Sequence, residues 1–156
     1  MSTLRPFPLS VLVRRAAAEL PTGSVFDLPV RSVYRGFPGL DLSARFHGRR
    51  AATPLGPAAG PHTQLAQNIA LAYLAGGRIL ELKTVQENDR ITVPRPCIDM
   101  RTVGFNVEWS QELALEDSLR EYAKARLLVA ILAELCAIPD AERDAVFDVS
   151  VGYDLR

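Results

Sequence analysis

The stretch TPLGPAAGPHTQLAQNIALAYLAGGRILELKT, residues 53–84, decides the fold of this chain. It opens with small, apolar residues and continues into an amphipathic run over residues 65–74, which ends at Gly76-Gly77. A glycine just after the last periodic residue is a typical helix stop. Residues 78–83 then have the composition of a strand. The order strand, turn, helix, glycine stop, strand predicts a βαβ unit and therefore parallel strands.

Apolar spacing also predicts elements upstream of this unit. Residues 9–20 have the periodicity of an amphipathic helix. One short strand is expected at residues 32–34, within a stretch that is rich in proline and glycine. Residues 42–46 and 50–53 flank His47-Gly48, and this pattern predicts a small hairpin.

Downstream, the spacing predicts a long helix over residues 113–135 and a third strand over residues 145–151. The helix positions expected in the core are Leu115, Leu119, Tyr122, Val129, Leu132 and Leu135. The chain is thus an α/β protein with roughly three βα steps. Three such strands form either a small open sheet or less than half of a (β/α)8 barrel, which usually needs about 250 residues.

Composition and charge exclude several classes of protein. The chain has 156 residues, which is enough for one domain with a core, and its 18 basic and 18 acidic side chains leave no net charge. No electrostatic case exists for binding nucleic acid or a charged membrane. No apolar run approaches the roughly 18 residues that span a bilayer. The two cysteines, Cys97 and Cys136, form neither a disulfide framework nor a metal site, so we expect a cytoplasmic protein.

The basic residues are strongly biased towards arginine. Of the 18, all but Lys83 and Lys124 are Arg. A lysine that persists against this bias can be required for its compact ammonium group, because Arg and Lys are not interchangeable at a tight site.

Two segments lie where an α/β sheet binds its ligands, at the carboxyl ends of the expected strands. The turn at residues 58–60 is small enough for its backbone amides to approach a planar or anionic ligand, although tight strand–helix turns favour small residues in any case. Lys83 and Thr84 end the second strand, and they could equally be an exposed strand end. Glu81 is expected on the same face as Lys83.

A second group of candidates lies in a loop. Asn106 is followed by Glu108 and by the single tryptophan. An amide both donates and accepts, so Asn106 can recognise a ring with both kinds of group, or it can simply cap a turn. His62 could act as a base and Cys97 as a reactive thiol, although a capping histidine and an inert thiol explain them as well.

Four segments together resemble one family. They are residues 53–86, PRPCID (94–99), GFNVEWSQELALEDSLREY (104–122) and VSVGYDL (149–155). They look like the N-terminal part of the YgfK-type selenate reductase subunits, which belong with the flavin oxidoreductases related to dihydropyrimidine and dihydroorotate dehydrogenases. The resemblance implies an incomplete FMN-type TIM barrel over residues 51–156, preceded by an N-terminal extension over residues 1–50.

The resemblance also implies FMN as the cofactor and assigns residues to it. In the related dehydrogenases, the first barrel strand ends in a small-residue turn against FMN, which matches Ala58, Ala59 and Gly60 here. Their second strand ends in a lysine followed by a threonine or serine that contacts flavin and substrate, which matches Lys83 and Thr84.

The resemblance also implies substrate-binding residues, but it implies no catalytic residue and no iron–sulfur cluster in this sequence. A loop asparagine and glutamate that bind the substrate ring in the pyrimidine enzymes match Asn106 and Glu108, beside Lys83. The catalytic acid or base of the relatives would lie beyond Arg156, so no catalytic residue is assigned. No cysteine-rich pattern for an iron–sulfur cluster occurs in this chain.

Two functions of different classes remain. The chain is either the N-terminal portion of a flavin-dependent oxidoreductase acting on a small molecule, with the missing barrel half in a longer chain or a partner subunit, or a non-catalytic α/β module that docks to a partner and completes its barrel. A small independent enzyme that uses His62 or Cys97 is a third alternative. The sequence leaves the substrate and the oligomeric state open.

Overall fold

The structure is a computed structural model that describes residues 4–86, 98–99, 105–106 and 113–152. Three helices are α1 (Leu9–Glu19), α2 (Ala66–Leu74) and α3 (Leu115–Leu135). Four short 3-10 turns are η1 (Leu20–Thr22), η2 (Val30–Ser32), η3 (Pro61–Gln64) and η4 (Asp140–Glu142). The strands are β1 (Ser24–Val25), β2 (Leu28–Pro29), β3 (Ala44–Phe46), β4 (Arg49–Ala51), β5 (Ile79–Glu81), β6 (Val85–Gln86), β7 (Ile98–Asp99), β8 (Phe105–Asn106), β9 (Val146–Asp148) and β10 (Val151–Gly152).

Parallel strands form the centre of the fold. β5 pairs in parallel with β9, and β6 continues the pairing with β10. On the other side of β5, the carbonyl of Leu55 accepts the N–H of Ile79 at 3.0 Å, and the carbonyl of Pro57 accepts the N–H of Glu81 at 3.3 Å. The partners advance by two residues on both sides, as in a parallel ladder. The predicted βαβ unit and the third strand are therefore confirmed, with the first strand present as an extended segment rather than a regular strand.

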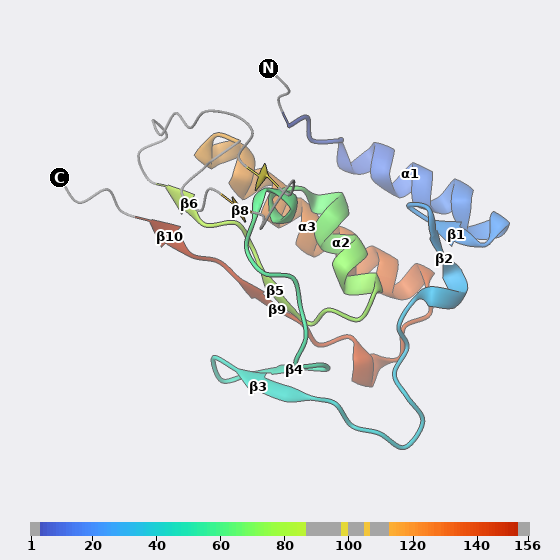
Figure 1. The fold of residues 1–156 in the computed structure, drawn as a ribbon. Helices are drawn as coiled ribbons and strands as arrows, with labels where there is room; N and C mark the ends of the chain where they lie inside the picture. The colour runs from blue at the N-terminus through green and yellow to red at the C-terminus, as the bar shows by residue number, and fades with distance from the viewer. Residues whose placement is uncertain (1–3, 87–97, 100–104, 107–112, 153–156) are drawn as a thin grey trace.

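The helices pack on one face of these strands (Figure 1). Leu80 and Leu82 point to that face and are completely buried, whereas Glu81, between them, is exposed on the opposite face. α2 lies against α3, and α1 contacts α3. The α1 residues Leu12 and Ala16 belong to the same hydrophobic cluster as residues of α2 and α3, so the N-terminal helix is part of one core. The domain boundary at residue 50 stays a prediction.

The N-terminal elements confirm one expectation and correct another. β3 and β4 form the predicted antiparallel hairpin, with His47 and Gly48 both at positive φ, as a tight two-residue turn requires. The strand expected at residues 32–34 is wrong, because Val30–Ser32 forms the 3-10 turn η2. Proline at position 29 lacks an N–H and favours the start of a helical turn.

Helix α3 occurs as predicted, but part of its expected core face is wrong. Leu119 is 68% exposed, and Leu115 and Leu135 are exposed as well. Tyr122, Val129 and Leu132 are buried as expected, together with Ser118, Glu121, Ala125, Leu128 and Ala133. The helix therefore has a wider apolar surface than α1, α2 and the strands cover.

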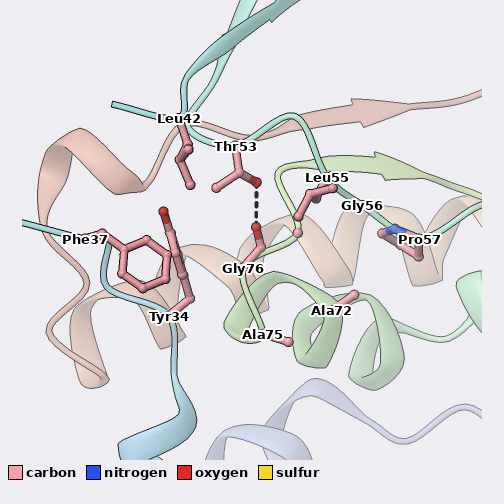
Figure 2. Close-up of a pocket in the computed structure, with 11 residues that line it drawn as sticks. Tyr34, Phe37, Leu42, Thr53, Leu55, Gly56, Pro57, Ala72, Ala75 and Gly76 are labelled. Atoms are coloured by element: carbon pink, nitrogen blue, oxygen red, sulfur yellow. Dashed lines mark hydrogen bonds between the residues drawn. The ribbon is translucent and has the colours of Figure 1, made fainter. Parts of the chain in front are cut away.

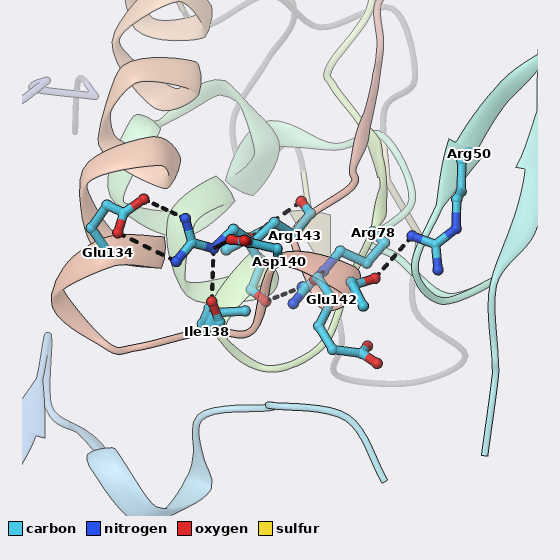
Figure 3. Close-up of polar contacts among 9 residues, drawn as sticks. Arg50, Arg78, Glu134, Ile138, Asp140, Glu142 and Arg143 are labelled. Atoms are coloured by element: carbon cyan, nitrogen blue, oxygen red, sulfur yellow. Dashed lines mark hydrogen bonds and ion pairs between the residues drawn. The ribbon is translucent and has the colours of Figure 1, made fainter. Parts of the chain in front are cut away.

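Arg78 joins three elements at the end of the sheet where the strands begin (Figure 3). Its side chain is completely buried; Nε donates to the carbonyl of Glu142 at 2.6 Å, and Nη1 donates to those of Tyr73 at 2.5 Å and Gly77 at 2.9 Å. The guanidinium also stacks 3.9 Å from the ring centroid of Tyr73. Burial lowers the pKa of Arg78. The charge is tolerated because carbonyl oxygens and ring faces surround it.

Replacement of Arg78 by methionine is expected to destabilise the chain by about 3 kcal/mol, because three buried or part-buried carbonyls each lose a donor. Urea unfolding followed by circular dichroism measures the loss. Arg120→Met is the matched control, since that arginine is mostly exposed on α3 and pairs only with exposed acids. Equal unfolding midpoints for the two variants would refute this role for Arg78.

Candidate functional site

The candidate residues of the first two strands meet at the carboxyl ends of these strands. Glu81 ends β5, and its carboxylate accepts the N–H of Ala59 at 3.0 Å. The predicted turn over residues 58–60 therefore lies directly against the second strand. Lys83 follows two residues later, between β5 and β6, and Thr84 is next to it, half-buried. The structure thus brings the turn and the Lys83-Thr84 pair to one end of the sheet.

Two of the three amides of the turn over residues 58–60 already donate within the chain. The N–H of Ala59 is bound to Glu81, and the N–H of Gly60 donates to the hydroxyl of Thr63 at 3.1 Å. A carboxylate beside the turn also repels a second negative group. The expected approach of these amides to a planar or anionic ligand stays a prediction, and the bonds of Ala59 and Gly60 favour a planar, uncharged ring against the small side chains.

Lys83 is the basic group of this end of the sheet. Only 3% of the residue is exposed, and its backbone carbonyl accepts the hydroxyl of Tyr122 at 2.5 Å. This hydrogen bond connects the segment that follows β5 to α3. Lys124, the other lysine, forms an ion pair with the buried Glu121. Lys83 therefore occupies a confined site, whereas 17% of the Lys124 side chain is exposed.

Glu121 holds the beginning of α2 in place. Only 2% of Glu121 is exposed, and its carboxylate accepts the N–H of Ala66, the first residue of α2, at 2.9 Å. Leu65, at the N-cap position, provides no side-chain cap, so Glu121 supplies one from α3. Lys124 also donates to the carbonyl of Phe7 at 2.8 Å, which extends the contact towards α1.

Replacement of Glu121 by alanine is expected to destabilise the chain by about 2–3 kcal/mol, because it leaves the N–H of Ala66 and the ammonium of Lys124 without this acceptor. Glu116→Ala is the control on the same helix, where the pair with Arg120 is exposed and contributes about 0.5 kcal/mol or less. Chemical denaturation of both variants measures the difference. A shift no larger than that of the control would contradict the capping role.

The other candidates are not tested at this site by the described residues. Asn106 lies in β8, opposite Ile98 of β7. The structure does not describe its side chain. Glu108 and Cys97 lie outside the described residues, so their expected roles stay predictions. His62 is exposed in η3. Cys136 is buried, and burial raises the pKa of its thiol, which disfavours a reactive thiolate.

Sequence reasoning missed Glu121, Tyr122 as a polar contact, and Gln64. Gln64 is completely buried, and its side-chain oxygen accepts the N–H of Leu113, just before α3. Tyr122 binds the carbonyl of Lys83, whereas Glu121 and Gln64 connect α2 and η3 to α3 and the residue before it. The absence of a capping side chain at Leu65 was the one sequence signal that a partner for α2 must come from elsewhere.

A cavity of about 430 Å³ borders the segment that leads into the turn, with Gly56 and Pro57 in its wall (Figure 2). Its walls include Tyr34, Phe37 and Leu55, and the hydroxyl of Thr53 inside it already donates to the carbonyl of Gly76 at 2.6 Å. Among the described residues, no charged side chain lines it. It offers apolar packing, and it shares no residue with the 58–60 turn or with Lys83-Thr84.

In the part of the chain that the structure describes, no group of three or more His, Cys, Asp or Glu side chains could hold a metal ion. None of the helices in the described ranges combines the length and apolar character needed to cross a bilayer.

Comparison with known proteins gives a clear result. The family described as "Oxidoreductase YgfK, N-terminal TIM-barrel domain" matches residues 26–156. The chain is 42% identical over 154 residues to "Putative oxidoreductase YgfK" of Escherichia coli strain K12, and equally to the protein of the same name from E. coli O157:H7. The match covers 98% of this chain but 15% of each relative. No solved structure shows significant similarity to the chain.

Proposed function

Because this chain belongs to the family of the N-terminal TIM-barrel domain of the oxidoreductase YgfK, we propose that it supplies the first strands of a flavin-dependent oxidoreductase barrel. The observation that carries the proposal is the buried Lys83 at the carboxyl end of the central strand, next to the small-residue turn over residues 58–60. That end of a β/α barrel is where ligands bind. The reaction acts on a small molecule, and the cytoplasmic location stays part of the proposal.

The described residues fit the ring of FMN better than its phosphate. Ala58, Ala59 and Gly60 have no side chain beyond Cβ, which permits close approach of a flat ring, while the N–H groups of Ala59 and Gly60 are already used. When bound, FMN supplies hydride or electron transfer. The phosphate site of such barrels lies near strands seven and eight, outside this chain.

Each residue of the site has a distinct task in this proposal. The ammonium of Lys83 stabilises negative charge on the ring or on the substrate, and Thr84 donates a hydrogen bond beside it. Glu81 holds the turn in place through the N–H of Ala59. Asn106 and Glu108 recognise the substrate in the proposal, as the related pyrimidine enzymes suggest. The carboxyl ends of the first strands form only part of the ligand site, so the proposal requires the other strands of the barrel.

The rest of the barrel belongs to a longer polypeptide or to a partner subunit in this proposal. The chain spans about 15% of the length of the curated relatives it matches, so their activity as whole proteins comes to this chain only as a proposal. Glu81 is exposed on the face of β5 opposite the helices. In a complete barrel, side chains fill the interior on this face. The exposure of Glu81 therefore supports the need for the other strands.

A non-catalytic docking module is the second candidate. It is favoured by the turn over residues 58–60, in which the amides of Ala59 and Gly60 already donate within the chain, and by the apolar surface of α3 that the described elements leave open. In that case the module completes the barrel of a partner and holds no flavin contacts of its own.

Titration of the complete gene product with FMN and with riboflavin distinguishes the two. We expect stoichiometric flavin, detected by quenching of its fluorescence, and riboflavin binding that is weaker than FMN binding but measurable. The docking-module hypothesis predicts flavin binding that is unaffected by substitution at Lys83 or Thr84. No flavin binding by the complete gene product would refute the proposed oxidoreductase function.

A further inference from the structure

The parallel pairing shifts by one residue between β5 and β6, where these strands run beside β9 and β10 (Figure 1). The N–H of Leu82 donates to the carbonyl of Asp148 at 2.9 Å, and the N–H of Val85 donates to the carbonyl of Ser150 at 3.1 Å. From 82 to 85 is a step of three residues, whereas from 148 to 150 is a step of two. A regular parallel ladder advances by two on both strands. The first strand of this pair therefore has one extra residue, a β-bulge over residues 83–84.

The bulge interrupts the alternation of side chains along the strand. Leu82 belongs to the hydrophobic cluster under the helices, and Val85 joins this cluster three residues later. In a regular strand, residue 84 would take that place, and residue 83 would share the exposed face of Glu81. Lys83 is instead 3% exposed, and Thr84 is half-buried. The bulge, and not simple alternation, therefore sets the surroundings of these two side chains.

A side chain of α3 binds the backbone of the bulge. Carbonyls of a regular strand lie in the sheet and face the adjacent strands. The carbonyl of Lys83 accepts the hydroxyl of Tyr122 at 2.5 Å, from a helix that packs on the face of the sheet. Tyr122 is 8% exposed and belongs to the hydrophobic cluster, so packing holds its ring in place. The hydrogen bond thus attaches the bulge to a rigid element.

We propose that Tyr122 is a positioning residue, whose hydroxyl holds the bulge over residues 83–84 and thereby fixes the direction in which the side chain of Lys83 leaves the sheet. Bulges are frequent next to active sites, where they redirect a side chain, and they are rare in parallel pairs. A group that acts on a bound ring must be held to within about 0.5 Å, and the long stem of a lysine does not provide this precision by itself. The inference rests on the proposed function for the contact between Lys83 and the flavin ring, whereas the bulge and its hydrogen bond exist without flavin.

The two buried tyrosines provide a matched pair of variants. Tyr122→Phe removes the hydroxyl and keeps the ring. Tyr73→Phe is the control, because the hydroxyl of Tyr73 donates to the carbonyl of Arg143 at 3.3 Å, at the end of the sheet where the strands begin, and Tyr73 is 1% exposed.

Flavin binding by the complete gene product gives the first readout. We expect Tyr122→Phe to weaken the binding of FMN and of riboflavin about tenfold, because the side chain of Lys83 must then be ordered on binding. Tyr73→Phe should leave both affinities within about twofold of the original. Equal losses in the two variants would overturn the positioning role.

A double-mutant cycle separates positioning from general destabilisation. If Tyr122 acts through Lys83, Lys83→Met removes the group that is positioned. The variant that carries both Lys83→Met and Tyr122→Phe should then bind flavin within about twofold of Lys83→Met alone. Losses that multiply would show that Tyr122 acts independently of Lys83, and the proposal would be wrong.

Amide hydrogen exchange, measured by mass spectrometry on peptides of the complete gene product without ligand, tests the bulge itself. Tyr122→Phe should raise the exchange rates of Leu82 and Val85 at least about tenfold more than that of Val146, whose N–H donates to Arg78 at the other end of the sheet. Tyr73→Phe should give no such local increase. A uniform increase along the strand, or none, would overturn the hold on the bulge. Because this readout involves no flavin, a failed flavin titration refutes the proposed function, while exchange alone decides whether Tyr122 holds the bulge.

Discussion

Substitution of Gly56 by alanine is expected to abolish cooperative folding of the chain or to cost at least about 3 kcal/mol. A Cβ at this position would lie 1.4 Å from the carbonyl oxygen of Ile79, which is backbone and cannot rotate away. The two backbones approach closely because the carbonyl of Leu55 accepts the N–H of Ile79 at 3.0 Å. The cost is therefore loss of the contact between the first and second strands.

Gly39→Ala separates this effect from ordinary glycine strain. Gly39 has φ +75°, and nothing lies within 4 Å of a Cβ there, so alanine costs only the backbone strain of about 1 kcal/mol. Urea unfolding of both variants, followed by far-ultraviolet circular dichroism, gives the comparison. If Gly56→Ala unfolds at the same urea concentration as Gly39→Ala, the close approach of the two strands is wrong.

Substitution of Lys83 has the largest effect expected on function. In the complete gene product, Lys83→Met should weaken flavin binding by about 10- to 100-fold, the loss expected for one hydrogen bond to a charged group. The binding of FMN and the binding of riboflavin should weaken by the same factor, because this end of the sheet contacts the ring and not the phosphate. A loss confined to FMN would place Lys83 at the phosphate and contradict the assignment.

The two lysines allow a matched control. Lys83 is 3% exposed, so the larger, planar guanidinium of Lys83→Arg should not fit and should also lose flavin. Lys124→Arg keeps the ion pair with Glu121 near the surface and should retain full flavin binding. Equilibrium dialysis of the two variants measures this difference. Loss of flavin in both would indicate general destabilisation instead of a specific role for Lys83.

The sequence was sufficient to predict the elements that depend on local pattern. Gly76-Gly77 after an amphipathic run marked the end of α2, and two residues suited to positive φ marked the hairpin at His47-Gly48. The position of Lys83 at a strand end also followed from this order. These features are determined by residues within one or two turns of each other, which periodicity detects.

Features that depend on long-range contacts could not be predicted in this way. The bond from Ala59 to Glu81 spans 22 residues and uses an amide of the turn that was expected to approach a ligand. The cap of α2 comes from Glu121, 55 residues from Ala66. Leu119 was expected in the core because its spacing is apolar, but spacing alone cannot say whether the neighbour that covers it lies within the described chain.

The central claim is that the carboxyl ends of the first strands contact a flavin ring. An experimental structure of the complete gene product with FMN bound tests it most directly. The account predicts the ring against the turn of Ala58, Ala59 and Gly60, with the ammonium of Lys83 within hydrogen-bonding distance of a ring or substrate oxygen or nitrogen. A flavin bound elsewhere, with Lys83 buried away from it, would contradict the account.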